Sequence, residues 1–298
     1  MATTLYSPEY RAISFLNRQM VPQLVYHMNA RQFFEKVTTI PADKDVMMFD
    51  RITNMGEAIV SYNLVGKTAE TDEIQTTPDS INMLYISRKW SIPYTRWQAF
   101  ETEGIDLPVE NMKSALTVIG VKENQLLTNG YTPDGSTTRI SGLYGGAGNS
   151  YDNSKDFGTP GNAKDAVSGA LDLIYASKVD GVNFNLILNS AQYRQLSTSM
   201  MEYTNVPEMD LVMKLLNENE GPSQGRIFKS PYITAGTGLL SPADPDGEFI
   251  ELLVGQPITN DVGRDSKEPM TSPMYGKTFE KIAAHLIHSE AVCKLTVI

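Results

Sequence analysis

The sequence predicts an α+β fold that combines one long helix, an extended strand pair and a separate α/β unit. Three observations support this prediction. A helical pattern of about two dozen residues starts near Asp106. Strand-like segments flank a polar stretch at residues 66–80. Strand and helix patterns then alternate over residues 162–256, as they do in compact α/β units.

Composition limits the class of protein. The 298 residues are 41% hydrophobic and 20% charged, a globular balance that permits one large domain or two modest ones. Twenty-five basic and 35 acidic residues give a net charge of −10, so a general attraction to nucleic acid is not built in. The single cysteine, Cys293, excludes an internal disulfide, and its apolar neighbours predict burial. With no membrane-length apolar run or signal-peptide core, we expect a soluble intracellular protein.

Two short amphipathic pieces make up the start of the chain. In the first, Ser7 and Pro8 are suited to a helix cap and first turn. Its apolar face consists of Tyr10, Ile13, Leu16 and Met20. The second helical piece is predicted over residues 23–37 and carries Phe33 and Phe34. Because neither piece has a neighbour in sequence that would bury it, we expect an arm that packs on another copy.

A long two-stranded ribbon is predicted next. Strand patterns occupy residues 45–52, 59–65 and 81–92, and the polar stretch 66–80 has the composition of an exposed tip between the last two. An isolated ribbon of two strands is marginal in water, so it needs a surface outside the monomer. Lys67 at the tip is suited to an ionic or covalent bond with another chain, although an exposed lysine is the simpler interpretation.

The long helix has clear start and stop signals. Asp106 is placed to cap its first turn, Pro108 fits that turn, and Gly130 tolerates the left-handed conformation at its end. Its apolar stripe consists of Met112, Ala115, Leu116, Ile119 and Leu126. The charged residues predicted to lie off this stripe are Glu110, Lys113 and Glu123. Such a helix spans roughly 35 Å, which is long for an ordinary domain.

Residues 131–161 are rich in glycine, serine, asparagine and aspartate. We expect a long loop that is functional or ordered by a partner. Its glycine cluster at 142–148 lacks both the GxxxxGK[ST] pattern and the dinucleotide spacing, which argues against nucleotide binding. A soluble α/β enzyme with its site in this cluster remains one alternative.

The α/β unit contains three predicted helices, at residues 162–179, 190–201 and 207–219. Its predicted strands lie at 182–189, 226–234 and 248–255. The first helix has an apolar side made of Ala166, Val167, Ala170, Leu173 and Ile174. The closing segment, 279–298, is predicted to return and pair beside the long helix.

Signals for chemistry are weak. The histidines, His27, His285 and His288, belong to no HExxH motif, triad order or metal pair, and the last two lie in predicted strand. Asp244, in SPADPDGEF, resembles the start of a calcium loop, but a turn between strands fits better. Trp90 is interpreted as a core or interface anchor. We predict no catalytic residue, no metal and no cofactor.

Several short motifs, taken in their order along the chain, resemble those of a known family. The chain contains W-S-I-P from Trp90, K-E-N-x-L-L-x-N-G ending at Gly130, G-L-Y-G-G from Gly142, E-L-L-V-G-Q, Y-G-K-T-F-E-K and C-K-L. In this order they resemble the major capsid proteins of tailed phages, which share the Hong Kong 97-type fold with the encapsulin shell proteins.

The resemblance implies a domain division. Residues 1–40 would form an N-terminal arm and 57–92 the extended loop. The peripheral domain, with the long helix as its spine, would combine residues 41–56, 93–161 and 257–298. Residues 162–256 would form the axial domain around five- and six-fold axes.

The function expected from the resemblance is structural. Copies would assemble as pentamers and hexamers into an icosahedral shell in the virion, which is put together in the host cytoplasm and confines double-stranded DNA without specific binding. Portal, scaffold and decoration proteins are further expected partners, and a membrane is not. The residues predicted at inter-subunit contacts are Tyr10, Leu16, Phe33, Lys67, Glu70, Asp72, Arg88 and Trp90. An encapsulin compartment around an enzyme cargo is the main alternative.

Overall fold

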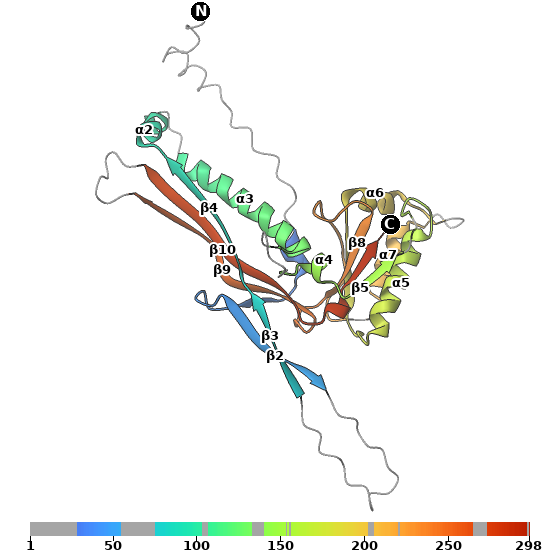
Figure 1. The fold of residues 1–298 in the computed structure, drawn as a ribbon. Helices are drawn as coiled ribbons and strands as arrows, with labels where there is room; N and C mark the ends of the chain where they lie inside the picture. Colours follow the sequence, from blue (N-terminus) through green and yellow to red (C-terminus); the bar gives the residue numbers. More distant parts are fainter. Residues whose placement is uncertain are drawn as a thin grey trace, which may run out of the picture.

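The computed structural model describes most of the chain. The described residues are 29–54, 75–102, 107–132, 140–152, 154, 156–201, 206–219, 221–264, 273–296 and 298. They form a four-stranded sheet, a five-stranded sheet and a two-stranded ribbon. Figure 1 shows the ribbon extending away from a body that contains the other two sheets. The predicted α+β class is therefore confirmed.

The four-stranded sheet carries the long helix. Its strands are β1 (Val37–Thr39), β9 (Ile250–Arg264), β10 (Met274–Leu286) and β4 (Leu84–Ile92). They follow one another in that order, with β1 parallel to β9 and the other pairs antiparallel. Helix α3 lies along this sheet against β4 and β10, and the short helix α2 (Tyr94–Thr102) leads from β4 toward it (Figure 1).

Helix α3 spans 23 residues, Leu107–Asn129, so its predicted length is confirmed. Gly130 follows with φ +81°, and its amide donates to the Leu126 carbonyl at 2.7 Å. The predicted cap, Asp106, lies outside the described residues. The prediction that Glu123 lies off the apolar stripe is wrong, because its side chain is buried where α3 packs on the rest of the body.

The five-stranded sheet belongs to the α/β unit. Its strands, in spatial order, are β5 (Asn149–Asp152), β11 (Cys293–Thr296), β8 (Thr237–Ala243), β6 (Asn183–Leu188) and β7 (Ile227–Lys229). Its helices are α5 (Asn162–Ala176), α6 (Ser190–Thr198) and α7 (Glu208–Leu216). All three predicted helices are confirmed. The apolar side of α5 is buried except at Leu173, which is exposed, so that one assignment is wrong.

Several strands join a different sheet from the one expected. The predicted strand 248–255 becomes β9 of the four-stranded sheet, because it pairs with β1 and β10. The closing segment divides: β10 lies beside α3 as predicted, whereas β11 pairs with β5 and β8. His285 is in β10, but His288 only precedes the 3₁₀ turn η2 (Ser289–Ala291) that separates β10 from β11. The segment that forms β8 shows little alternation of apolar and polar residues, and no strand is predicted there from the sequence.

The glycine-rich segment is more ordered than its composition predicts. It contains a short helix, α4 (Leu143–Gly146), and then β5, and it buries Leu143 and Phe157. A Cβ placed on Gly142 would lie 2.3 Å from the Gly130 amide nitrogen, so the chain after α3 and the chain before α4 touch backbone to backbone. This position therefore requires glycine, because any side chain would prevent the close packing.

The ribbon is formed by β2 (Val46–Asn54) and β3 (Gln75–Asn82), paired antiparallel. The prediction that 66–80 is entirely loop is wrong from Gln75 onward, because the residues from Gln75 pair with β2. The prediction that 84–92 is a ribbon strand is also wrong, because β4 pairs with β10. The predicted strand 59–65 lies outside the described residues.

Residues 29–39, here called the strap, contain the 3₁₀ turn η1 (Ala30–Phe33) and β1. The prediction of a helix over 23–37 is therefore wrong for residues 29–37, the part that the structure describes. These residues form one 3₁₀ turn, which ends at Phe33, and then lead into β1. Phe33 and Phe34 belong to a core shared with α3, β9 and the five-stranded sheet. The strap thus packs on its own chain. The domain boundaries given above remain predictions.

Within the described residues, no helix is both long and apolar enough to cross a membrane.

Candidate functional site

The base of the ribbon is clamped to one face of the four-stranded sheet. Met47 and Ile81 pack beside a small buried cluster formed by Met83, Leu253 and Ala283. The Phe49 ring lies 4.6 Å from that of His285, and Lys281 Nζ donates to Asp45 at 2.6 Å and to the Ala42 carbonyl at 3.0 Å. These contacts fix the direction in which the ribbon leaves the body (Figure 1).

The opposite face of the ribbon is open. Side chains alternate between the faces of a strand, so Val46 and Met48 point away from the face that carries Met47. Met48 is 79% exposed, and its cross-strand neighbour is Ser80. A long apolar side chain on an isolated ribbon is typical of a surface that another molecule covers.

The four-stranded sheet also has an uncovered region, on the face away from α3. Tyr85 and Tyr275 are about half exposed, at 50% and 51%. Lys277 Nζ lies 4.9 Å from the centre of the Tyr85 ring and 5.0 Å from that of Phe279. This aromatic and cationic group, Tyr85, Tyr275, Lys277 and Phe279, is called the sheet patch below. Its composition is typical of interfaces.

The predicted contact residues fall into three groups. Tyr10, Leu16, Lys67, Glu70 and Asp72 lie outside the described residues. Arg88 is exposed on β4, and Trp90 is half-buried on the same strand, where its ring covers Gly276 of β10. Phe33 is fully buried within its own chain, so the expectation that it contacts a neighbouring subunit is corrected to a role in the core.

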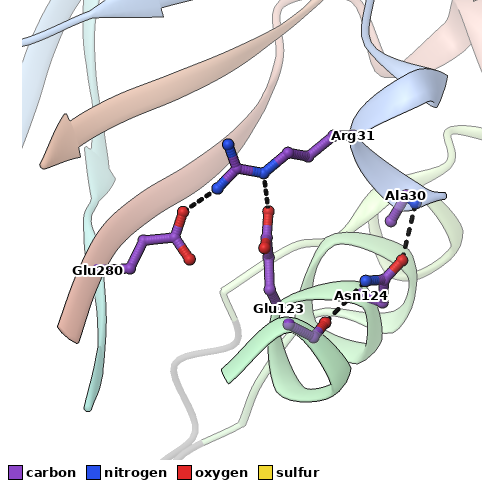
Figure 2. Close-up of polar contacts among 6 residues, drawn as sticks. Ala30, Arg31, Glu123, Asn124 and Glu280 are labelled. Carbon is purple, nitrogen blue, oxygen red and sulfur yellow. Dashed lines mark hydrogen bonds and ion pairs between the residues drawn. The ribbon is translucent and has the colours of Figure 1, made fainter. Parts of the chain in front are cut away.

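The strap ties the two sheets together. The Asn29 side chain donates to the Lys229 carbonyl of β7 at 2.8 Å, and the Ala30 amide donates to Asn124 of α3 at 2.8 Å (Figure 2). Farther along, the Thr38 hydroxyl donates to Glu251 of β9 at 2.5 Å. A segment of eleven residues therefore contacts both sheets and the long helix.

A charged cluster lies at the centre of these contacts. Arg31 Nε donates to Glu123 of α3, and its Nη2 donates to Glu280 of β10 (Figure 2). Burial and, to a smaller extent, the charge of Glu123 together raise the pKa of the Glu280 carboxyl to about 7, against the lowering effect of the Arg31 charge. Burial also raises the pKa of Glu123, against the hydrogen bond and charge of Arg31. We call these three residues the triad.

The triad was missed by sequence reasoning, although a signal for it existed. Met112, Leu116, Ile119, Glu123 and Leu126 follow one another at steps of four, three, four and three residues. That spacing places Glu123 on the apolar stripe of α3 rather than off it. A charge on a buried stripe implies a partner, but the sequence gives no indication that Arg31 and Glu280 supply it.

The remaining polar groups support structure. His285 Nδ1 lies 2.7 Å from Glu251, and Asp244 accepts from the amides of Gly247 and Phe249, which confirms the predicted turn. Cys293 is fully buried as predicted, and burial raises its pKa to about 11. Among the described residues, no group of three histidine, cysteine or acidic side chains is arranged to hold a metal ion.

Solved structures with a similar fold are capsids and particles. The capsid of Myoviridae phage XM1 has a TM-score of 0.77 at 12% identity, and the match covers 96% of this chain and 98% of that one. The capsid of a native GTA particle has a TM-score of 0.65 at 11% identity and 99% coverage of both chains. A virus-like particle from Pyrococcus furiosus has a TM-score of 0.57 at 16% identity, covering 89% of this chain and 90% of that one. No curated protein sequence matches.

These likenesses establish that the fold is the Hong Kong 97-type capsid fold expected from the sequence. A match to a family model assigns the chain to a particular family. The model described as "Encapsulating protein for peroxidase" matches residues 27–272, which is most of the chain. The chain therefore belongs to the family of encapsulating proteins that this model describes.

Proposed function

We propose that the chain is a structural subunit that assembles, as pentamers and hexamers, into the closed icosahedral capsid of a tailed phage. The capsid of phage XM1, whose fold is similar over nearly the whole chain, supports this proposal. The proposal includes no reaction. Portal, scaffold and decoration proteins would be added partners, and assembly would take place in the host cytoplasm.

The observation that carries the proposal is the ribbon. Its two strands contact the body at their base and then continue outward (Figure 1). A two-stranded sheet is marginal by itself, and Met48 on its open face is 79% exposed. Contact with a neighbouring copy would supply the missing cover, and repeated contact of this kind generates a closed assembly.

We place the tip of the ribbon on the sheet patch of the next subunit. The tip sequence contains Glu70 and Asp72, whose charge is opposite to that of Lys277 in the patch. Exposed Tyr85 and Tyr275 would supply apolar contact area on either side of the ion pair. Arg88, Trp90 and Lys67 remain proposed contact residues; Arg88 and Trp90 lie on the other face of β4 from Tyr85, so they would belong to a separate contact.

DNA would be confined rather than bound. The chain carries a net charge of −10, so a lining built from it would not attract phosphate groups strongly. Packaged double-stranded DNA would therefore be retained by the closed shell. The expected signature is DNA release that follows shell opening and shows little dependence on salt.

Electron microscopy and size-exclusion chromatography of the purified protein test the proposal. We expect closed particles of uniform size. A stable monomer or dimer that forms no particles under any assembly condition would refute it. The ribbon is tested by deleting residues 66–74, which leaves β3 intact because that strand begins at Gln75. The deletion variant should fold but fail to form particles, and a variant that still assembles normally would contradict the role of the tip.

The second candidate function is a compartment around an enzyme cargo. The family match over residues 27–272 favours it, since the family description names peroxidase as the enclosed protein. The contents of particles purified from native cells distinguish the two candidates. Nuclease-protected DNA of uniform length supports a phage capsid, whereas a stoichiometric enzyme identified by mass spectrometry supports the compartment.

A further inference from the structure

The triad joins one partly exposed cation to two buried anions from different elements. The Arg31 side chain is 46% exposed, while those of Glu123 and Glu280 are 6% and 0% exposed. Figure 2 shows the guanidinium of Arg31 lying between the carboxylates of α3 and β10. The arginine can therefore return to water without unfolding the body, whereas the carboxylates cannot.

With all three groups ionised, the triad carries one excess negative charge. Among the described residues, Glu280 Oε2 is buried and has no hydrogen-bond partner. A buried carboxylate with an unsatisfied oxygen is costly, and a proton on Glu280 would remove the excess charge. The pKa of Glu280, about 7, places this protonation near neutral pH.

Few other charges face Glu280. On β4, Ile86 lies directly opposite it, and Arg88 lies two residues along, opposite Thr278. On β9, Gln256 and Thr259 pair with the neighbours of Glu280, so the bulge opposite Glu280 consists of Pro257 and Ile258, which are uncharged. Arg31 from the strap and Glu123 from α3 are thus the ionisable groups that shift the pKa of Glu280.

We propose that the triad is a proton-linked latch, which fastens the strap to α3 and β10 and loosens when Glu280 is protonated. The turn that carries Arg31 has four residues and no side-chain cap, so its position depends on tertiary contacts. Apart from the triad, the hydrogen bond from Ala30 to Asn124 is what joins this turn to α3 in Figure 2. Losing one ion pair therefore loosens the Arg31 turn against α3 and β10, while Phe33, Phe34 and the pairing of β1 with β9 still hold the strap to the body.

The direction of the effect follows from the charge of Arg31. In the closed state Arg31 lowers the pKa of Glu280. If Arg31 moves into water while Glu280 stays buried against α3, that lowering influence is lost while the effect of burial persists, so the pKa of Glu280 rises above its closed-state value. The open state therefore binds the proton more tightly, and opening becomes easier as pH falls from alkaline values through 7. A difference of one pH unit between the two pKa values makes opening about tenfold easier.

The latch has a structural consequence beyond the turn itself. The strap contacts both sheets, through Asn29 at one end and β1 at the other. Proton binding at Glu280 is thereby coupled to the packing between the two sheets. This coupling is a property of the single chain and does not depend on the proposed function.

Hydrogen–deuterium exchange with mass spectrometry tests the latch. Peptides covering residues 29–37 would be followed between pH 9 and pH 6, with rates corrected for intrinsic exchange. We expect their protection to fall about tenfold, while a peptide from α5 (162–176) keeps its protection. In Glu280→Gln, which is neutral at all pH values, strap protection should be low throughout and independent of pH.

A matched control is Glu208→Gln, which removes another fully buried carboxylate, at the start of α7. It should keep the pH dependence of the strap peptides. An unchanged pH profile in Glu280→Gln would overturn the proposal. Loss of protection in the strap and α5 peptides at the same pH would also overturn it, because that pattern indicates global unfolding.

Discussion

The rings of Phe33 and Phe228 lie 5.2 Å apart between centroids, tilted by 59°, and they join the strap to the edge strand β7 of the five-stranded sheet. Phe33 has no exposed surface. Because an aromatic side chain fills this junction, the two sheets and the strap share one core. The strap is thus a structural part of the body, although it lies at the start of the described chain.

Phe33→Ala should lower the free energy of unfolding by about 3–5 kcal/mol, through lost burial and the cavity left behind. Chemical denaturation measures this loss. Val37→Ala in the same strap is the control, because Val37 is 53% exposed. Its expected effect is within about 0.5 kcal/mol. Equal losses in the two variants would contradict the assignment of Phe33 to the core.

Glu280→Gln should change how stability depends on pH. Folding raises the pKa of Glu280 from 4.5 to about 7, so its contribution to stability is full below pH 4.5 and is lost as pH rises through 7. Relative to the variant, the wild type should lose up to about 3 kcal/mol between pH 5 and pH 8. Urea denaturation at both pH values measures the difference. A difference that does not vary with pH would show that Glu280 is ionised throughout.

Met48→Ser should impair assembly without impairing folding, since Met48 is 79% exposed in the single chain. Circular dichroism is expected to match the wild type, while size-exclusion chromatography shows fewer particles. Leu173→Ser, on the exposed side of α5, controls for removal of a surface apolar group and should leave particle yield unchanged. Normal particle yield from Met48→Ser would remove the ribbon face from the proposed interface.

Gly142→Ala should be strongly destabilising, because the added Cβ would lie 2.3 Å from the Gly130 nitrogen and 2.6 Å from the Leu126 carbonyl oxygen. Both neighbours are backbone atoms that cannot move aside cheaply. We expect a loss of about 3 kcal/mol or more, measured by thermal unfolding. Gly263→Ala is the control, since nothing lies within 4 Å of its added Cβ. A mild effect at Gly142 would mean that α4 can shift away from α3.

Cys293 should be unreactive toward thiol reagents in the native protein at pH 8. It is fully buried, and burial raises its pKa to about 11, so the reactive thiolate is scarce. Ellman's reagent should titrate one thiol only after denaturation. Rapid reaction of the native protein would place Cys293 at a surface or in a segment that opens often.

The local sequence pattern was sufficient to predict those elements whose caps and apolar spacing lie within a single segment. The start near Leu107 and the end at Gly130 mark α3, because caps and apolar spacing act within a few turns. The same holds for the helices α5, α6 and α7. Local pattern failed for the strap and for β3, where a short polar or aromatic segment has no periodicity that separates strand from turn.

The sequence by itself determined the α+β class, the long helix and the burial of Cys293, since each depends on local spacing and hydrophobicity. Only the tertiary structure decided that β9 leaves the α/β unit, that β11 enters it, and that Arg31 meets Glu123 and Glu280. Strand partners and buried ion pairs join residues far apart in the chain. Arg31 and Glu280 are 249 positions apart, and no local pattern records which distant charge will satisfy a buried carboxylate.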